Sequence, residues 1–388
     1  MLSSLFGKKS NLCPLANQCS GCEWITTPLS TQQINKATEM TNLLLEYDIP
    51  HSEKITVASL GVSAERLFVD LSFERVGDQA ILGLYDIERE HLVDIGRCPA
   101  TTKDVQDLIE ALRDDPPPID RASFRLRVNP HGQWGLWIDA ANIDIRTLLN
   151  EARWLTRWMD KAHIELGQRR KYLQQSNQRL KLEAPFLRHW FSTYLPSTNQ
   201  QFILWSVVGG FSQPSNKGVK YLVQQIERLM QSYRDLGTWL EFGSGSGTFT
   251  LPLSQLVQKV IATESSPLAR KALTQALKHH KIENVVVSPL NIQRQTNASI
   301  ELLEQAEAML VDPPRSGLGH TLQTIEKATR KPQVILYVSC HGRTLCKDGQ
   351  QLRTMGYALQ QIQGIDQFPN TPHCEWISVW VHNSLRSL

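Results

Sequence analysis

The stretch "GTWLEFGSGSG", residues 237–247, joins a short apolar run to a glycine-rich turn. It begins a repeated pattern in which short apolar runs alternate with segments of helical character. The later runs are "KVIATES" (259–265), "NVVVSPL" (284–290), "AEAMLVDPP" (306–314), "QVILYVSC" (333–340) and "WISVWVHN" (376–383). Strands that alternate with helices are typical of a doubly wound α/β sheet. We therefore predict a Rossmann-like α/β domain with a doubly wound sheet over residues 206–388.

The composition of this 388-residue chain is that of an ordinary globular protein, with 41% hydrophobic and 20% charged residues. Its length suggests two or three domains. No apolar run approaches the roughly 18 residues of a membrane-spanning helix, and residues 1–15 lack the long apolar segment of a secretory signal. We therefore expect a cytoplasmic protein with no membrane partner. The net charge of +3 permits nucleic-acid binding without indicating it.

Four cysteines suggest a metal or cluster site. Three of the chain's seven cysteines crowd into "CPLANQCSGC", in which Cys13, Cys19 and Cys22 have C-x5-C-x2-C spacing. A fourth thiolate, Cys98, lies in the Gly- and Pro-containing segment "DIGRCPA". An odd number of cysteines without an export signal argues against a disulfide framework. Four thiolates suit either a tetrahedral zinc ion or an iron–sulfur cluster, and the spacing alone leaves both open.

The region before the α/β domain mixes predicted helices and strands. We predict helices over 31–48, 101–115 and 145–163, strands between 55 and 90, and a hairpin around 129–132. Residues 167–191 carry six basic residues interleaved with aromatic ones. Such a segment can follow a phosphate backbone and stack bases, but a solvated helix face explains it equally well. Both interpretations stay open from this segment alone.

Ligands of open α/β sheets bind beyond the carboxyl ends of the strands, so the residues that follow each predicted strand are candidates. Gly243, Gly245 and Gly247 follow the first strand, where glycines allow a ligand to approach the backbone. Glu264 follows the second strand, where a carboxylate can bind a ribose diol. Together they suggest an adenosine-containing cofactor. NAD and S-adenosylmethionine both fit this pattern.

Reactive side chains follow two of the later predicted strands, and a third one lies just before the last strand. Asp312 lies in "LVDPPRSG", Cys340 in "YVSCHGRTLCKD" and Glu375 in "FPNTPHCEWISVWV". A thiolate that adds to C6 of a pyrimidine makes its C5 nucleophilic enough to attack a sulfonium methyl group. A carboxylate can then remove the C5 proton, after which the thiol is eliminated. We expect Cys340 to be the nucleophile and Glu375 the base, with His341 or Lys347 lowering the pKa of the thiol.

These residues resemble the RNA 5-methyluridine methyltransferase family, whose members methylate uracil C5 in ribosomal and transfer RNA with S-adenosylmethionine. The resemblance is specific from Phe211 to Val381 and implies a class I methyltransferase domain. The family's F-x-Q motif appears as "FSQ", which makes Gln213 a cofactor-contacting residue. Its glycine loop appears as "LEFGSGSG". The resemblance also implies cofactor contacts at Gly243, Gly245, Gly247, Glu264 and Asp312.

The catalytic motifs match as well. "YVSCHGRTLCKD" resembles the family's S-C-N-P-x-T-L-x-x-D and makes Cys340 the nucleophile, whereas "FPNTPHCE" resembles F-P-x-T-x-H-x-E and makes Glu375 the base. The sequence departs from the family at His341 and Gly342, which replace Asn-Pro. The alternatives are a methyltransferase for exocyclic amines, against which Cys340 argues, and a catalytically impaired RNA-binding relative.

The cysteine spacing resembles family members that hold a 4Fe–4S cluster, which implies that Cys13, Cys19, Cys22 and Cys98 bind one here. The short stretch before Cys13 leaves no room for the TRAM barrel of some relatives, as in the shorter branch that acts on 23S ribosomal RNA. We therefore expect a monomer that acts on 23S ribosomal RNA, with a transfer RNA uridine as the alternative. We expect an iron–sulfur region with strands over 1–100, a smaller α+β RNA-binding region over 101–205, and the methyltransferase domain over 206–388.

Overall fold

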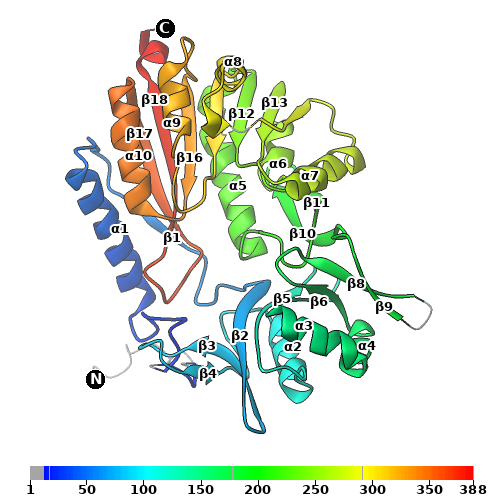
Figure 1. The fold of residues 1–388 in the computed structure, drawn as a ribbon. Coiled ribbons are helices and arrows are strands. Elements are labelled where there is room, and N and C mark those ends of the chain that lie inside the picture. Colours follow the sequence, from blue (N-terminus) through cyan, green and yellow to red (C-terminus); the bar gives the residue numbers. More distant parts are fainter. Residues whose placement is uncertain (1–12, 17, 177–178, 291, 388) are drawn as a thin grey trace, which may run out of the picture.

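The computed structural model describes residues 13–387 apart from residues 17, 177–178 and 291 (Figure 1). In this part of the chain two large sheets lie at opposite ends of the molecule. A β-ribbon of β10 (Arg188–Leu195) and β11 (Gln200–Ser206) lies between them in Figure 1.

The first sheet is doubly wound, which confirms the prediction. In the described residues its strand order is β1-β17-β18-β16-β15-β12-β13-β14, and every pair is parallel except those that involve β18. The strands are β1 (Val57–Ser59), β12 (Thr238–Phe242), β13 (Lys259–Thr263), β14 (Val285–Ser288), β15 (Ala308–Val311), β16 (Val334–Ser339), β17 (Tyr357–Asp366) and β18 (Glu375–His382). β16 is buried along its whole length, because helices cover both faces of the sheet.

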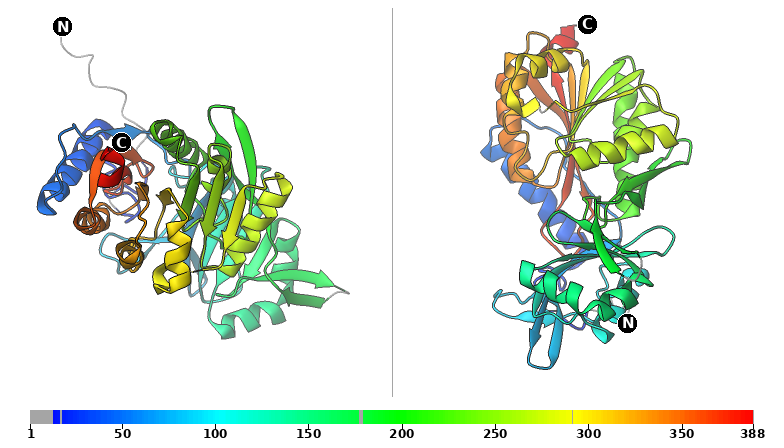
Figure 2. Two further views of the ribbon diagram at one scale, coloured as in Figure 1. Left: turned by 90° about the horizontal axis from the view of Figure 1, so that it is seen from above. Right: turned by 45° about the vertical axis from the view of Figure 1, so that its right-hand side comes forward.

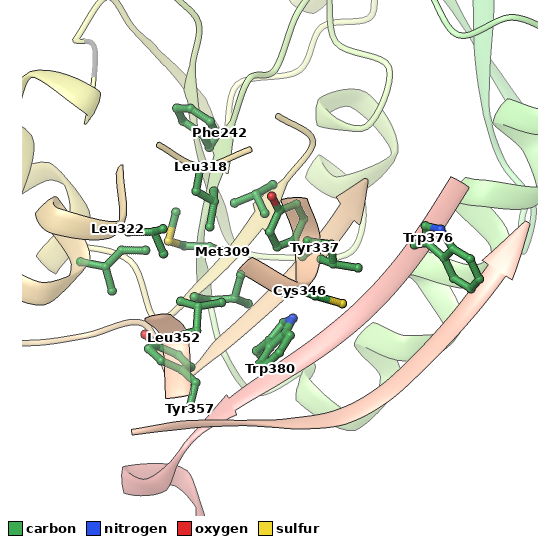
Figure 3. Packing of buried hydrophobic residues seen from close by; sticks show 14 of the residues in the cluster. Phe242, Met309, Leu318, Leu322, Tyr337, Cys346, Leu352, Tyr357, Trp376 and Trp380 are labelled. Atoms are coloured by element: carbon green, nitrogen blue, oxygen red, sulfur yellow. The ribbon is translucent and has the colours of Figure 1, made fainter. Parts of the chain in front are cut away.

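Helices pack on the two faces of this sheet and form separate apolar cores (Figure 2). One face carries α1 (Leu29–Glu46), α8 (Asn297–Glu304), α9 (Thr321–Lys327) and α10 (Gly342–Thr354), and the other carries α5 (Asn216–Met230), α6 (Thr250–Ser254) and α7 (Pro267–His279). Figure 3 shows the first of these cores, with Tyr337, Cys346 and Trp380 among its buried side chains. No helix in the described part of the chain is long and apolar enough to cross a bilayer.

The N-terminal residues complete this first sheet. β1 pairs in parallel with β17 at the sheet edge, and α1 packs beside α10 (Figure 1). Residues from both ends of the chain therefore share one core, and the carboxyl-terminal strands depend on α1 for the burial of that face.

The second sheet has the order β4-β3-β2-β5-β6-β7-β8-β9 in the described residues. Its strands are β2 (Phe68–Val76), β3 (Gln79–Tyr85), β4 (Leu92–Asp94), β5 (Arg121–Val128), β6 (Trp134–Asp139), β7 (Ala162–Leu166), β8 (Lys171–Ser176) and β9 (Arg179–Glu183). The helices of this region are α2 (Lys103–Asp114), α3 (Asn142–Asn150) and α4 (Ala152–Met159), and all three contribute to its core. The sheet continues across residue 100, where the sequence suggested a boundary.

Local predictions differ from the structure at two places in this region. The helix expected over 145–163 is two helices, because Glu151 leaves helical geometry with φ −91° and ψ 54°. Strands β8 and β9 pair as an antiparallel hairpin, so the helix-face interpretation of the basic segment is wrong. The hairpin forms because β8 pairs with β7, which gives its backbone hydrogen-bonding partners that local sequence patterns do not reveal.

Candidate active site

A cavity of about 800 Å³ opens where β12, β13, β15 and β16 end. This volume lies within the roughly 300–1,000 Å³ of typical small-molecule sites. The parallel strands bring side chains that are far apart in sequence to one edge of the sheet. The predicted site residues that line the cavity are Gln213, Gly243, Gly245, Glu264, Asp312, Cys340 and Glu375.

The three glycines of the turn after β12 serve different purposes. Gly243 has φ 76°, and a Cβ atom there would lie 3.0 Å from the carbonyl oxygen of Asp312. Gly245 has φ 55° with open space around its Cα, so it leaves room beside the cavity wall. Gly247 does not line the cavity; a Cβ atom there would crowd Leu251 and lie 2.8 Å from Leu273 Cδ1. Its observed role is close helix packing, and its predicted cofactor contact stays a prediction.

The Glu264 carboxylate is held beside the glycine turn. Its Oε2 accepts a hydrogen bond from the Gly245 amide at 3.0 Å, and its Oε1 accepts one from the Ser266 amide at 2.6 Å. Oε1 also accepts a hydrogen bond from the Ser265 hydroxyl at 3.4 Å. Each carboxylate oxygen has about two lone-pair sites, so Oε2 can still accept a hydrogen bond from a ligand. Since it lies in the cavity wall and is fixed in orientation, Glu264 is suited to bind a diol.

Asp312 is a partly buried acid in the cavity wall. Gln213 Nε2 donates a hydrogen bond to Asp312 Oδ2 at 3.2 Å, so the two predicted residues are in direct contact. Burial raises the pKa of Asp312 to about 7, and the hydrogen bond from Gln213 opposes that rise. Pro313 and Pro314 follow it and prevent helical continuation, which leaves Asp312 at the strand end.

Cys340 follows β16 and is half-buried in the cavity wall. Burial raises the pKa of its thiol, and so does the charge of Glu375, whereas a hydrogen bond from Arg315 and its positive charge lower it. Arg315 therefore fills the role that we expected of His341 or Lys347. The signal for Arg315 was its position directly after the Asp-Pro-Pro turn, which aims it into the same cavity.

Glu375 begins β18 and is only 3% exposed, yet its carboxyl group faces the cavity. Burial raises its pKa well above the ordinary value, and the charge of Asp312 raises it further. Gln367 Nε2 lies 3.5 Å from Glu375 Oε2, at the limit of a hydrogen bond. A positively charged ligand in the cavity would favour the ionised forms of Glu375 and Asp312.

The two other C-terminal cysteines lie outside the cavity. Cys346 is fully buried in the core of Figure 3, where its Sγ lies 3.8 Å from Met40 Sδ. Burial raises the pKa of Cys346 to about 12. Cys374 is also buried, with its Sγ 3.5 Å from the carbonyl oxygen of Ile365, and burial raises its pKa strongly. Neither thiol lines the cavity, whereas Cys340 does.

Helix α1 holds the loop that carries Glu375. Lys36 Nζ forms a buried ion pair with Asp366 Oδ1 at 2.8 Å, and both side chains are at most 1% exposed. Gln32 exchanges two hydrogen bonds with Asn370, one through its Nε2 and one through its Oε1. The loop 366–375 is therefore tied at two points to a helix from the other end of the chain.

The segment 206–213, which leads into the first sheet, is anchored to the second sheet by buried charges. Glu165 accepts hydrogen bonds from the Val208 amide at 2.7 Å and the Gly209 amide at 3.0 Å. Arg127 Nη2 donates to the Gly210 carbonyl at 2.6 Å. Burial raises the pKa of Glu165 to about 7 and lowers that of Arg127 to about 9. These contacts fix the backbone just before Gln213.

Residues at or just before two strands of the second sheet form a cationic rim, which the sequence did not predict to be part of the cavity. Arg66, Phe68 and Arg170 line the cavity. Phe211 also lines it and is 75% exposed, so its ring is free to contact a ligand. The guanidinium groups make the opening suited to an anion such as a phosphate. The run "AERLFVDLS" (64–72), which holds Arg66 and Phe68, was a weak signal for this rim.

The departures at residues 341 and 342 have a structural explanation. His341 is the N-cap of α10, and its Nδ1 accepts a hydrogen bond from the Thr344 amide at 3.3 Å, as an asparagine side chain would. A Cβ atom on Gly342 would lie 2.9 Å from Met40 Cε. The changed residues therefore preserve the helix start next to Cys340.

The four N-terminal cysteines are all partly buried. Burial and the charges of Cys98, Cys19 and Cys13 together raise the pKa of Cys22 to about 11, so the thiols lie within electrostatic range of one another. Trp24, which follows the cysteine loop, donates its amide to the Asn370 carbonyl at 2.8 Å. Within the described residues, no three or more His, Cys, Asp or Glu side chains are arranged to hold a metal ion.

The family profile described as tRNA (Uracil-5-)-methyltransferase matches residues 163–383, more than half of the chain. The chain belongs to this family of RNA uracil-C5 methyltransferases. It is 31% identical to an uncharacterized RNA methyltransferase of Bdellovibrio bacteriovorus over 94% of this chain and 93% of that protein. It is 23% identical to a 23S rRNA (uracil(1939)-C(5))-methyltransferase of Pectobacterium carotovorum over 96% of this chain and 80% of that protein.

The fold is similar to that of a solved family structure, the tRNA (uracil-54, C5)-methyltransferase of Pyrococcus abyssi in complex with S-adenosyl-L-homocysteine. The TM-score is 0.67 at 18% sequence identity, over 97% of this chain and 88% of that one. At this identity the similarity establishes the mixed α/β methyltransferase fold. The family's shared chemistry is methyl transfer to uracil C5. Of the two named relatives, the Pectobacterium protein is a ribosomal RNA methyltransferase and the Pyrococcus protein is a transfer RNA methyltransferase.

Proposed function

We propose that this protein methylates C5 of a uridine in RNA, with S-adenosylmethionine as methyl donor and with Cys340 as covalent nucleophile. The observation that carries the proposal is that a half-buried thiol, Cys340, and a buried carboxyl, Glu375, face one cavity in a chain of this family. The structure at the strand ends also supplies the polar groups that a nucleoside cofactor requires.

The residues around the glycine turn fit S-adenosylmethionine. Among the described residues the buried Ser244 Oγ atom has no hydrogen-bonding partner, and Ser244 lines the cavity, so the turn offers an unused polar group. We assign the ribose to Glu264, the open backbone to Gly243 and Gly245, and a further contact to Gln213 and Asp312. When bound, the cofactor supplies an electrophilic methyl group.

Catalysis begins with the thiolate of Cys340. Its sulfur forms a bond to C6 of uracil, the C5=C6 π electrons move onto the C4 carbonyl, and C5 becomes nucleophilic. Arg315 stabilises the thiolate, because its positive charge and hydrogen bond lower the thiol pKa that burial raises. The rim arginines Arg66 and Arg170 are placed to bind the phosphates of the substrate.

Glu375 completes the reaction. After C5 has taken up the methyl group it still carries its proton, and Glu375 removes that proton as a general base. The electron pair of the C–H bond restores the C5=C6 double bond, and Cys340 leaves as a thiolate. The ties between α1 and the loop 366–375 keep the base in position for this step.

The proposed substrate is 23S ribosomal RNA, with a transfer RNA uridine as the alternative. In cells without this gene, we expect 5-methyluridine to be missing from one position in ribosomal or transfer RNA. Mass mapping of RNA digests measures this loss. Wild-type protein should restore the site and the Cys340→Ala variant should not. A loss confined to transfer RNA would replace ribosomal RNA as the substrate, and no loss in either RNA would refute the proposed function.

We further propose that Cys13, Cys19, Cys22 and Cys98 bind a 4Fe–4S cluster. The support is the donor set, four partly buried thiols within electrostatic range. In such a cluster each thiolate binds a different iron, so the sulfurs surround the cluster and do not converge on one ion. The cysteine loop contacts Asn370 through Trp24, which suggests a structural role for the cluster near the loop of Glu375.

The metal content tests the cluster. Anaerobically purified protein should be brown and contain iron and acid-labile sulfide in equal amounts, because each cluster holds both. Cys98→Ser should lose most of that iron, since it removes one of the four ligands, whereas Cys346→Ser, a thiol in the core, should keep it. Stoichiometric zinc without iron in anaerobic wild-type protein would refute the proposal.

A further inference from the structure

The hairpin formed by β8 and β9 projects from the edge of the second sheet, away from the body of the molecule (Figure 1, Figure 2). Between residues 169 and 188 the chain has six basic side chains and one acidic side chain, Glu183. We call the described residues of this stretch the basic hairpin. Its composition differs from that of the whole chain, whose net charge is only +3.

The positive charges of the basic hairpin are not neutralised by the protein. No ion pair in the described part of the chain involves Arg169, Lys171, Arg179 or Lys181. Arg179 and Lys181 lie on the edge strand β9, and both are exposed. Unpaired charges of one sign on a projecting element create a field that attracts a polyanion.

A stack of flat groups lies at the base of the basic hairpin. The Arg188 guanidinium lies over the Phe186 ring at 4.8 Å and over the Tyr172 ring at 5.5 Å, measured to the ring centroids. Arg188 Nη2 also donates to the Tyr172 hydroxyl at 3.1 Å. The stack is therefore held in place, yet Phe186 remains 53% exposed. An exposed, pre-positioned ring is a platform on which an unpaired base can stack.

The stack is continuous with the active-site cavity. Leu187, between Phe186 and Arg188, lines the cavity, and so does Arg170, which directly precedes β8. The six residues of β8 then lead outward from this rim over about 20 Å at ~3.3 Å per residue. An RNA strand whose reacting base lies in the cavity can therefore continue from Arg170 across the stack to the charges of β9.

We propose that the basic hairpin binds the single-stranded RNA that flanks the reacting uridine, with its phosphates on Lys171, Arg179 and Lys181 and a base on Phe186. The inference rests on the proposed function, since it places the reacting uridine in the cavity. Single-stranded RNA is favoured over a duplex because the faces of duplex bases are already stacked, whereas the Phe186 platform requires a free face. The exposed cations complement the charge of the RNA backbone.

The test of this surface measures the binding of a fluorescein-labelled oligouridylate across a salt series. The oligouridylate has about twelve nucleotides, a length within the range of single-strand sites. Arg179→Glu with Lys181→Glu should weaken binding at least tenfold and reduce the slope of log K against log salt by about 1.4, at ~0.7 for each phosphate that the protein no longer neutralises. Phe186→Ala should weaken binding about tenfold without changing the slope, because stacking involves no counterion release.

A matched control reverses two exposed cations on the far side of the molecule. Lys54, in the loop before β1, and Lys347, on α10, are both exposed, and these elements lie away from the hairpin (Figure 1). Lys54→Glu with Lys347→Glu should keep the affinity and salt slope of the wild type. Unaltered thermal unfolding and S-adenosylmethionine affinity in all variants would show that the fold and the cofactor site are intact.

The inference would be overturned if both hairpin variants kept the wild-type affinity and salt slope for the oligouridylate. A hairpin that binds a protein and not RNA would give this result. The proposed function fails by a different result, namely that the wild type forms no 5-methyluridine and no covalent adduct in any cellular RNA. Weakened oligouridylate binding in the hairpin variants would support the RNA surface even then, so the two failures are distinguishable.

Discussion

Cys340→Ala should reduce methyl transfer to RNA by at least about 10⁴-fold, because no other thiol can add to C6 of the uracil. Cys340 is half-buried in the cavity wall, whereas Cys346 and Cys374 are buried outside it. The variant should also form no protein–RNA adduct, since the adduct bond is the bond that the thiol would make. Incubation with RNA that contains 5-fluorouridine, followed by a denaturing gel, measures the adduct directly.

The control for this experiment is Cys346→Ala, which removes a thiol that packs against Met40 in the core. This variant should unfold at a lower temperature because it leaves a small void, but it should keep methyl transfer and the adduct wherever it is folded. An adduct band with the Cys340 variant would show that another residue is the nucleophile. Unaltered cofactor affinity in Cys340→Ala would establish that the loss is chemical.

Glu375→Gln should lower turnover by about 10²–10⁴-fold, the usual contribution of a general base, and should leave the enzyme attached to its RNA. Glutamine has the shape of glutamate and keeps an acceptor for the Gln367 amide, so addition and methyl transfer should still occur. It cannot remove the C5 proton, and therefore the Cys340–C6 bond cannot be eliminated. A denaturing gel with methyl-labelled cofactor should show a labelled protein–RNA band.

Asp348→Asn is the matched control for Glu375→Gln. Asp348 is a buried carboxyl group that accepts hydrogen bonds from the Tyr337 hydroxyl and the Leu318 amide, but it does not line the cavity. Its substitution should give no labelled band. Normal turnover in Glu375→Gln, or the same trapped band in Asp348→Asn, would contradict the assignment of Glu375 as the base.

The contrast between the two catalytic variants is the strongest test of the proposed reaction. Loss of the nucleophile prevents the adduct, and loss of the base preserves it. A protein that only binds RNA would show neither difference, because neither residue would form or break a bond. Both experiments therefore also test the alternative that this chain is a catalytically impaired relative.

Much of the candidate site followed from the sequence for a local reason. Each of the apolar runs from residue 238 onward ends in a polar or small residue, and parallel strands place those ends at one edge. This rule alone predicts that four residues meet at one cavity, and no long-range packing has to be known. They are Gly243, Glu264, Asp312 and Cys340. Glu375 was found by its motif, because it begins a strand that runs antiparallel to its neighbours.

Other features depend on contacts between segments far apart in the chain, which local patterns do not encode. Lys36 resembles an exposed residue of an amphipathic helix, yet it is buried because its partner Asp366 lies 330 positions away. The cationic rim of Arg66 and Arg170 forms only because the second sheet packs against the region of the cavity.

The sequence by itself determined the doubly wound sheet and the residues at its strand ends, because strand periodicity and chain direction are local properties. Only the tertiary structure decided that α1 and β1 complete that sheet, that Arg315 accompanies Cys340, and that β8 and β9 pair as a hairpin. The hairpin illustrates the physical reason. Its strands exist because β7 satisfies the backbone of β8, and such pairing is a property of the folded chain and not of its local composition.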